Sequence, residues 1–236
     1  KKVIAYYEDL YANISKAFNE AYWQDDKLVT DTQTAYVLAL YFNLLNEDRR
    51  NKAISNLVRK IHEFNDKIST GFLGTPYILH VLADNGYADI AYKLLLEKEY
   101  PSGIYSITKG ATTIWEHWDN IKPDGTFWSK DMNSFNHYAY GAVVDFMYEK
   151  IAGIRTDETA PGFKKIVFKP IVTKECGLLN VKAVIKTKNG QIASSWKIDG
   201  DKISYRFEVP KNSTAKIILK NTYYVESGIF EYIEEL

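Results

Sequence analysis

The sequence predicts two successive folds, a mainly α domain of paired helices followed by a small all-β antiparallel sandwich, and three observations indicate this. Apolar residues recur at three-to-four spacing up to about residue 155, which is typical of amphipathic helices. The polar segment Thr156-Asp157-Glu158-Thr159-Ala160-Pro161-Gly162 then interrupts the pattern. After it the apolar period changes to two, as in half-buried strands. We therefore expect domains at residues 1–157 and 158–236.

The helical part opens with an amphipathic helix over residues 3–18, where apolar residues such as Ile4, Tyr7 and Ile14 share one face. Asp31 is a plausible N-cap for a second helix that runs to Leu45 and is apolar nearly all round, as a helix buried between neighbours should be. Further helices are expected at residues 48–64, 75–86 with Thr75 as N-cap and Pro76 in the first turn, 87–98 and 133–153.

These helices, joined by short loops, fit a toroid of paired helices. Six or so of them make about half of a complete (α/α)6 barrel, so the barrel is expected to be partial. In the second domain Val181, Ala183 and Ile185 alternate with polar residues, and Asn189-Gly190 and Asp199-Gly200 are strong hairpin-turn signals. We expect six or so strands between residues 163 and 233.

Composition excludes several classes of function. Lys and Arg total 30, as do Asp and Glu, so the zero net charge favours neither nucleic acid nor an anionic membrane as a partner. Cys176 is the single cysteine and cannot form an internal disulfide. We find no apolar run long enough to span a membrane, no phosphate loop, no metal-ligand spacing and no Gly-x-Ser-x-Gly elbow, and we expect no cofactor. The compartment cannot be read from this chain.

Two neighbouring segments carry the functional signal. The first is Ala111-Thr112-Thr113-Ile114-Trp115-Glu116-His117-Trp118-Asp119, and the second is Met132-Asn133-Ser134-Phe135-Asn136-His137-Tyr138-Ala139-Tyr140. Tryptophan offers a flat apolar face to the C–H side of a sugar ring, while a carboxylate and an imidazole handle its hydroxyls or an attacking water. The pattern therefore favours a pocket that binds or cleaves a carbohydrate.

With Gly71-Phe72-Leu73-Gly74-Thr75-Pro76-Tyr77, these motifs resemble the C-terminal half of the catalytic domain of bacterial α-L-rhamnosidases, family seventy-eight of the glycoside hydrolases. The resemblance covers residues 1 to about 170 well and the β-sandwich loosely. It implies a six-hairpin fold and a glycosidase that removes terminal α-L-rhamnose from oligosaccharides or glycosides, with inversion and without a cofactor.

Glu116 is the leading catalytic candidate, and the resemblance makes it the general base. His137, expected in the first turn of a helix whose N-terminus would disfavour its protonation, is a candidate to hydrogen-bond a sugar hydroxyl. Asn136 is a second candidate contact, although an asparagine at such a position is more often a helix cap. Trp115 and Trp118 are candidate sugar platforms, but their spacing does not show which contacts substrate, and we expect one of them in the core.

The family's general acid and several acidic residues lie in a part of the barrel that has no counterpart in this chain. We therefore expect these 236 residues to carry only the base side of the site and to be inactive alone, as a C-terminal piece whose partner is the N-terminal half of the same enzyme. The main alternative is a non-catalytic carbohydrate-binding or scaffold fragment. A third is another (α/α)6 enzyme, such as a lyase, although the pocket segments are not notably basic.

Overall fold

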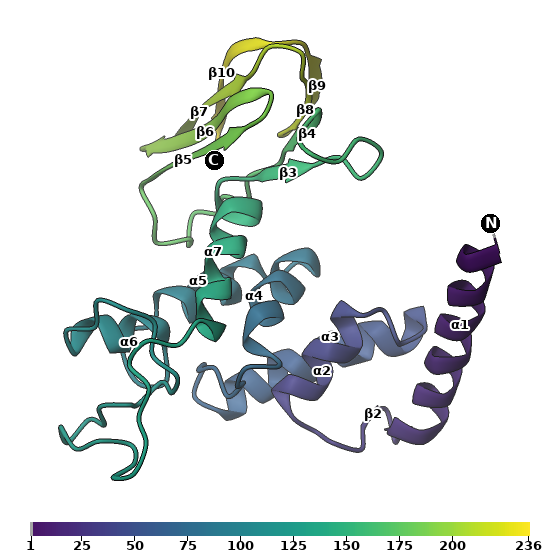
Figure 1. Cartoon of the computed structure of the whole chain (residues 1–236), viewed down its shortest axis with the longest axis vertical. Helices are drawn as coiled ribbons and strands as arrows, with labels where there is room; N and C mark the ends of the chain where they lie inside the picture. Colours follow the sequence, from purple (N-terminus) through teal and green to yellow (C-terminus); the bar gives the residue numbers. More distant parts are fainter. Residues whose placement is uncertain (1) are drawn as a thin grey trace. The chain divides into compact units, whose positions relative to one another are not determined.

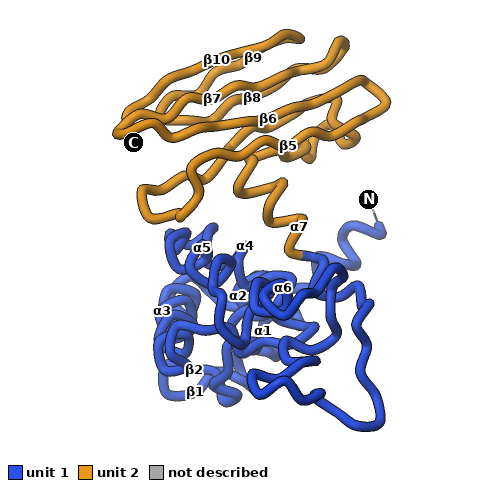
Figure 2. The backbone as a smooth tube through the Cα atoms, turned by 90° about the vertical axis from the view of Figure 1, so that its left-hand side faces the viewer, with its two compact units in different colours: residues 1–142 blue, residues 143–236 orange. Residues whose placement is uncertain are grey.

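The computed structural model describes residues 2–236 and separates the chain into two compact units, Lys1–Ala142 and Val143–Leu236 (Figure 2). Helices build the first unit, and strands dominate the second (Figure 1). No helix among the described residues combines the length and the apolarity needed to cross a bilayer.

In the first unit, helices pack against their neighbours along the chain. α2 (Gln33–Tyr41) contacts α3 (Glu47–Glu63) and α4 (Thr75–Asp84), and α4 contacts α5 (Ala88–Leu96). The successive pairs α2–α3 and α4–α5 have the form of helical hairpins. The unit also contains α1 (Lys2–Tyr22), strands β1 (Trp23–Gln24) and β2 (Lys27–Leu28), α6 (Gly103–Thr108) and the 3-10 helix η1 (Ala139–Ala142).

The core of this unit is formed by the apolar faces of α2, α3 and α4. Tyr36 and Leu40 of α2 lie with Leu57 of α3 and Leu82 of α4 among the largest fully buried side chains. The polar face of α3 remains partly exposed, with Arg59 within 2.8 Å of Asp31 and 2.5 Å of Glu63. Burial of α2 from several sides agrees with its nearly uniform apolar sequence.

Two predicted helix starts were wrong. Thr32, not Asp31, caps α2, and its hydroxyl accepts a hydrogen bond from the Ala35 amide at 3.3 Å. Asp31 instead accepts a hydrogen bond from the Tyr36 hydroxyl. α4 begins at Thr75 after Gly74, because the Thr75 hydroxyl is engaged with that of Thr70 at 2.8 Å rather than with the helix.

The last predicted helix is shorter than expected. Regular structure starts with η1 at Ala139 rather than at Asn133, so residues 133–138 form an irregular segment. The α2 helix also ends at Tyr41 instead of Leu45, whereas α1 continues to Tyr22, and α6 was not predicted. In residues 133–138 tertiary hydrogen bonds to residues 114–116 replace the helical pattern.

α1 differs from the other helices because none of its described residues is buried. It is fastened by polar contacts: the Tyr11 hydroxyl donates to the Asn43 carbonyl at 2.6 Å, and the Asn19 side chain donates to the Leu44 carbonyl at 2.6 Å. Next to Tyr11 on the helix surface lies the α1 stripe, which we define as Val3, Tyr7, Leu10 and Ile14, with exposed fractions of 67%, 62%, 39% and 49%.

The second unit begins with a short helix, α7 (Val143–Phe146) continued by the π-helical turn η2 (Met147–Ile151), and goes on as two four-stranded sheets. One sheet has the order β10-β7-β6-β5 and is antiparallel throughout, whereas the other has the order β3-β4-β8-β9 with β4 and β8 parallel. The strands are β3 (Ile154–Thr156), β4 (Lys165–Phe168), β5 (Asn180–Thr187), β6 (Gly190–Asp199), β7 (Lys202–Val209), β8 (Thr214–Ile218), β9 (Thr222–Val225) and β10 (Gly228–Glu235).

The two sheets enclose a common core. Phe168 of β4 contacts Phe207 of β7, with ring centroids 4.7 Å apart. Trp196 is 2% exposed, as expected of a core residue, and its indole nitrogen donates to the Ile151 carbonyl at 2.8 Å. The hairpins predicted at Gly190 and Gly200 are confirmed, and both glycines have positive φ values.

Candidate active site

All five residues predicted to act on a sugar lie in the first unit, on the largely irregular segment between α6 and η1. Two backbone hydrogen bonds bring its ends together: the Glu116 amide donates to the Ser134 carbonyl at 3.0 Å, and the His137 amide donates to the Ile114 carbonyl at 2.8 Å. Glu116 and His137, separated by some twenty residues in sequence, therefore lie on adjacent backbone segments.

Asn120 holds these segments in place. It is fully buried, its side-chain nitrogen donates to the Ser134 carbonyl, and its side-chain oxygen accepts from the His117 amide at 3.3 Å. Its own carbonyl accepts from the Trp128 amide at 3.1 Å. A buried asparagine whose side chain bonds two chain segments and whose carbonyl bonds a third fixes the backbone next to Glu116. The sequence analysis missed this residue, because nothing in its spacing separates it from an ordinary loop asparagine.

The two tryptophans beside Glu116 have different environments. Trp115 is 5% exposed and meets the ring of Phe135 edge-on, so it is the one that lies in the core. Trp118 is half-buried and stacks on Tyr140 with centroids 3.9 Å apart and an interplanar angle of 4°. The Trp118 indole nitrogen also donates to the Thr70 carbonyl at 3.2 Å, which fixes the orientation of the ring.

His137 precedes the helix and does not lie in its first turn. Its Nδ1 accepts a hydrogen bond from the Ala139 amide at 3.3 Å, and an accepting Nδ1 carries no proton. The neutral ring consequently holds its proton on Nε2, which is a hydrogen-bond donor. The neighbouring Asn136 is exposed.

A continuous series of rings connects these residues. Trp118 stacks on Tyr140, and Tyr140 makes an edge-to-face contact with Phe72, with ring centroids 5.3 Å apart. Phe72 in turn stacks on His137, with centroids 4.8 Å apart and an interplanar angle of 10°. We call Trp118, Tyr140, Phe72 and His137 the ring row. Phe72 lies in the loop before α4. The sequence analysis named it only as part of the family motif and did not predict a role for its side chain.

Negative charge is concentrated at the Trp118 end of the ring row. Burial raises the pKa of Tyr140 to about 12, and the carboxylates of Asp119 and Glu116 add to the effect. The pKa values of Tyr100 and Tyr105 are also raised, by burial and by Asp119. These phenols are therefore neutral near pH 7, and the two carboxylates provide the charge available for chemistry.

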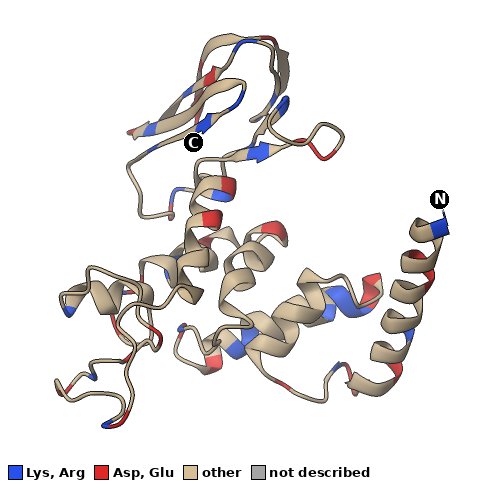
Figure 3. Ribbon diagram, in the orientation of Figure 1, with Lys and Arg blue, Asp and Glu red and all other residues tan. Residues whose placement is uncertain are grey.

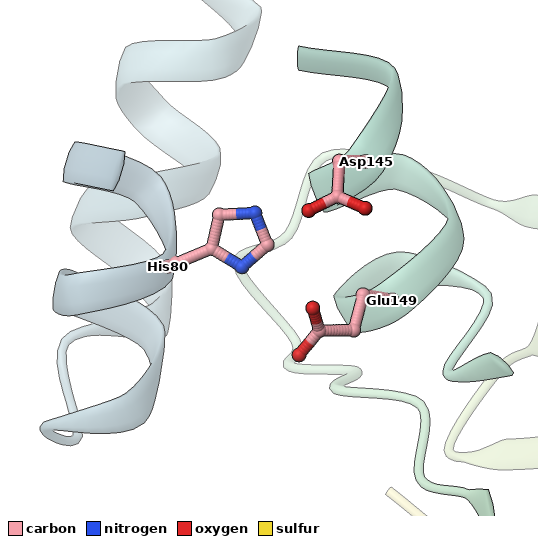
Figure 4. Close-up of side chains that lie close together, drawn as sticks. All are labelled: His80, Asp145 and Glu149. Carbon is pink, nitrogen blue, oxygen red and sulfur yellow. The ribbon is translucent and has the colours of Figure 1, made fainter. Parts of the chain in front are cut away.

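Further titratable side chains and one cleft lie outside the segment of residues 111–138. His80 is a buried residue of α4, while Asp145 and Glu149 project from successive turns of α7 and η2 (Figure 4). Within either unit taken by itself, the described residues contain no group of three side chains suited to hold a metal ion. A cleft of about 480 Å³ lies near Trp23 and Arg49, remote in sequence from the motif, and in it Lys52 pairs with Asp26 at 2.6 Å.

Comparison with known proteins identifies the family. A family model described as the bacterial alpha-L-rhamnosidase 6 hairpin glycosidase domain matches residues 1–151, and that of the bacterial alpha-L-rhamnosidase C-terminal domain matches residues 153–232. The chain belongs to the bacterial α-L-rhamnosidase family. This confirms the resemblance and the fold expected from the sequence, a partial six-hairpin toroid followed by a β domain.

Individual members of the family resemble the chain throughout its length. It is 43% identical over 219 residues to an α-L-rhamnosidase of Formosa agariphila, which covers 92% of the chain and 23% of that protein. Streptomyces avermitilis α-L-rhamnosidase, solved with L-rhamnose, superposes with a TM-score of 0.92 at 36% identity over 98% of this chain and 24% of its own. The α-L-rhamnosidase of Aspergillus terreus superposes with a TM-score of 0.92 at 31% identity, over 97% of this chain and 27% of its own. The chain thus spans about a quarter of these relatives.

Proposed function

We propose that this chain supplies the water-activating side of an inverting α-L-rhamnosidase that removes terminal α-L-rhamnose from oligosaccharides or glycosides. The observation that carries the proposal is the pair of backbone hydrogen bonds that sets Glu116 beside the segment of His137. Membership of the rhamnosidase family supports the reaction, and a 36% identical relative solved with L-rhamnose supports the sugar.

Glu116 is the general base in this proposal. An inverting glycosidase needs one carboxylate to deprotonate a water and a carboxylic acid about 6.5–9.5 Å away to protonate the leaving oxygen. Glu116 is half-buried, and its backbone is held by Ser134, so its carboxylate has a restricted position from which to orient a water.

His137 binds the sugar by donating from Nε2 to a hydroxyl, since its Nδ1 is occupied by the Ala139 amide. Trp118 offers the sugar the ring face that Tyr140 does not cover, while Trp115 supports the loop from the core. Asn136, exposed beside His137, can reach a second hydroxyl. No step of this mechanism requires a cofactor.

In this proposal the general acid comes from the N-terminal part of the same enzyme. We assign that part as the partner that covers the α1 stripe. Val3, Tyr7, Leu10 and Ile14 recur at the three- and four-residue spacing by which one helix buries its face against another. The other side of α1 already contacts the unit through Asn19. Since relatives have about three-quarters of their length outside the matched part, helices of that part are the occupants we propose.

Two alternatives make different predictions. A carbohydrate-binding fragment would bind rhamnose without turnover even when the N-terminal part is present. A lyase acting on uronates would need a positively charged groove. The segment of residues 111–138 instead carries Lys122 and Lys130 against the carboxylates Glu116, Asp119, Asp124 and Asp131 (Figure 3).

The proposal is tested in the extended enzyme, by which we mean this chain joined to the preceding part of its reading frame. We expect release of phenol from an aryl α-L-rhamnoside, and Glu116→Gln should lower kcat by at least about a hundredfold, because loss of a general base costs about 10²–10⁴ in rate. The matched control is Glu158→Gln in the loop between β3 and β4 of the second unit, which should leave kcat unchanged. Sugar binding without turnover in the unmodified extended enzyme would instead support the binding-only alternative.

A second pair of variants tests His137. Glutamine can place an amide N–H near the position of Nε2, whereas asparagine reaches only the position of Nδ1. His137→Gln should therefore retain more of kcat/KM than His137→Asn, which should lose about tenfold, the value of one hydrogen bond of about 1 kcal/mol or slightly more. The reverse order of the two variants would contradict the assignment of Nε2 as the donor.

A further inference from the structure

We propose that Phe72 is a substrate-contact residue that recognises the C6 methyl group of the sugar and thereby selects a 6-deoxyhexose. The inference rests on the proposed function, because it assigns Phe72 to the same sugar subsite as Glu116 and His137. It concerns a side chain to which neither the reaction nor the motif assigns a role.

Phe72 lies within the ring row, between Tyr140 and His137. The two ends of the row, Trp118 and His137, are proposed to contact the sugar. One face of the Phe72 ring stacks on His137 at 4.8 Å and 10°, and Tyr140 meets it edge-on at 5.3 Å. Tyr140 in turn stacks on Trp118, two residues from Glu116. Despite these contacts 40% of Phe72 remains exposed, so its ring presents apolar surface directly beside the donor of His137.

The loop that carries Phe72 is rigidly placed. The amides of Gly74 and Thr75 both donate to the Gly71 carbonyl, at 3.2 and 3.0 Å, which closes a turn around Phe72. A Cβ atom on Gly74 would lie 2.8 Å from the Thr70 side chain, so the backbone there has room only for glycine. The Thr70 carbonyl accepts from the Trp118 indole, which links this turn to the loop of Glu116.

The chemistry of the sugar gives this exposed ring a use. Rhamnose is a 6-deoxyhexose, so its pyranose ring carries one methyl group where mannose carries a hydroxymethyl group. Hydroxyls require donors and acceptors, which His137 and the carboxylates supply, but a methyl group is recognised by apolar surface. Phe72 is the ring-row member without a polar atom and is partly exposed, and it therefore matches the one apolar substituent.

The experiment compares three aryl glycosides in the extended enzyme: the α-L-rhamnoside, the α-L-lyxoside, which lacks C6, and the α-L-mannoside, which has a hydroxyl on C6. A methyl group in an apolar subsite is worth about 10–200-fold in kcat/KM. We expect Phe72→Ala to lower the ratio of kcat/KM for the rhamnoside to kcat/KM for the lyxoside by about tenfold or more, mainly because kcat/KM for the rhamnoside falls. The rhamnoside-to-mannoside ratio should also fall, and Phe72→Leu should be intermediate.

Leu73→Ala is the matched control, because Leu73 lies in the same turn, is 70% exposed and does not belong to the ring row. It should leave both ratios unchanged. An unchanged rhamnoside-to-lyxoside ratio in both Phe72 variants, with both variants folded by circular dichroism, would overturn the proposal, as would an equal change in Leu73→Ala. Absence of rhamnosidase activity in the unmodified extended enzyme would instead refute the proposed function, so the two failures are distinguishable.

Discussion

Asn120 shows how a single residue can determine the geometry of the candidate site. It has no role in the proposed chemistry, yet its side chain joins the backbone next to Glu116 to the segment before His137. Residues of this kind position a general base, because the backbone that carries the base could otherwise adopt many conformations. Trp118 is fixed in a similar way by one stack and one hydrogen bond.

Replacement of Asn120 by alanine should destabilise the first unit. It leaves the His117 amide without its partner beside a fully buried position and removes one of the two hydrogen bonds that the Ser134 carbonyl accepts, which costs about 1–3 kcal/mol in the free energy of unfolding. Urea unfolding followed by tryptophan fluorescence would measure this. Asn136→Ala, at an exposed asparagine of the same segment, is the control, and equal stability of the two variants would show that Asn120 is not the anchor.

Tyr140 makes stability depend on pH in the alkaline range. Its pKa is raised to about 12 in the folded chain, against an ordinary value of 10.0, by burial first and then by Asp119 and Glu116. The folded state thus holds this proton more tightly than the unfolded state. The contribution of Tyr140 to the free energy of unfolding is complete below pH 10 and is lost as pH rises through 12.

Tyr140→Phe should therefore reduce the loss of stability between pH 10 and 12 by up to about 2 kcal/mol, since one pKa unit corresponds to about 1.4 kcal/mol. The measurement is the free energy of unfolding at several pH values for both proteins. Tyr224→Phe is the control, because Tyr224 is 78% exposed. Parallel curves for the unmodified chain and Tyr140→Phe would show that the Tyr140 phenol titrates normally.

At the scale of elements, the site is built by segments that have little regular structure of their own. The ends of residues 111–138 are joined by two backbone hydrogen bonds, and a bridge between Ile121 and Phe127 closes the loop within them. The side chain of Asp124 accepts from the Thr126 amide at 2.9 Å and tightens the turn. The Tyr105 hydroxyl of α6 donates to the Ile121 carbonyl of this loop at 2.8 Å, and the Phe72 turn leads directly into α4.

The α1 stripe provides a prediction at this scale. Tyr7→Ser with Ile14→Ser should leave the thermal unfolding midpoint of the isolated chain almost unchanged, because the two side chains are 62% and 49% exposed. The same double variant should abolish binding of the separately produced N-terminal part, measured by calorimetry. Asp9→Asn with Lys16→Ser, elsewhere on α1, should bind normally. A large fall in the midpoint, or undiminished binding, would exclude the stripe as the interface.

At the scale of the whole molecule, the chain has the fold of its family but only about a quarter of the length of its relatives. If the proposed two-carboxylate reaction is divided between this chain and the rest of the enzyme, neither part should be active alone. The proposed reaction also predicts the stereochemical course. An inverting enzyme should release β-L-rhamnose first from an α-L-rhamnoside, because water attacks from the face opposite the leaving group.

Proton NMR of the extended enzyme acting on an α-L-rhamnoside would follow the anomeric signals before mutarotation equalises them. Early accumulation of the β-anomer is the expected result. The non-enzymatic interconversion of free rhamnose, recorded under the same conditions, provides the control. If the α-anomer accumulates first, the enzyme retains configuration, and Glu116 is then not the base of a single displacement.

Much of this protein can be predicted from the sequence because the signals are local. Apolar periodicity of three to four and then of two determines a helical part followed by strands, and the Gly190 and Gly200 turns determine the hairpins between them. The family resemblance likewise depends on contiguous motifs. These features need no knowledge of how distant segments meet.

The tertiary structure decided the rest, because it depends on contacts between segments far apart in sequence. The backbone of residues 133–138 is bonded to residues 114–116 instead of to its own next turn, so His137 is not helical, and its tautomer follows from the Ala139 amide. The difference between Trp115 and Trp118, and the place of Phe72 beside His137, arise where separate loops pack together. Periodicity within one segment carries no information about such contacts.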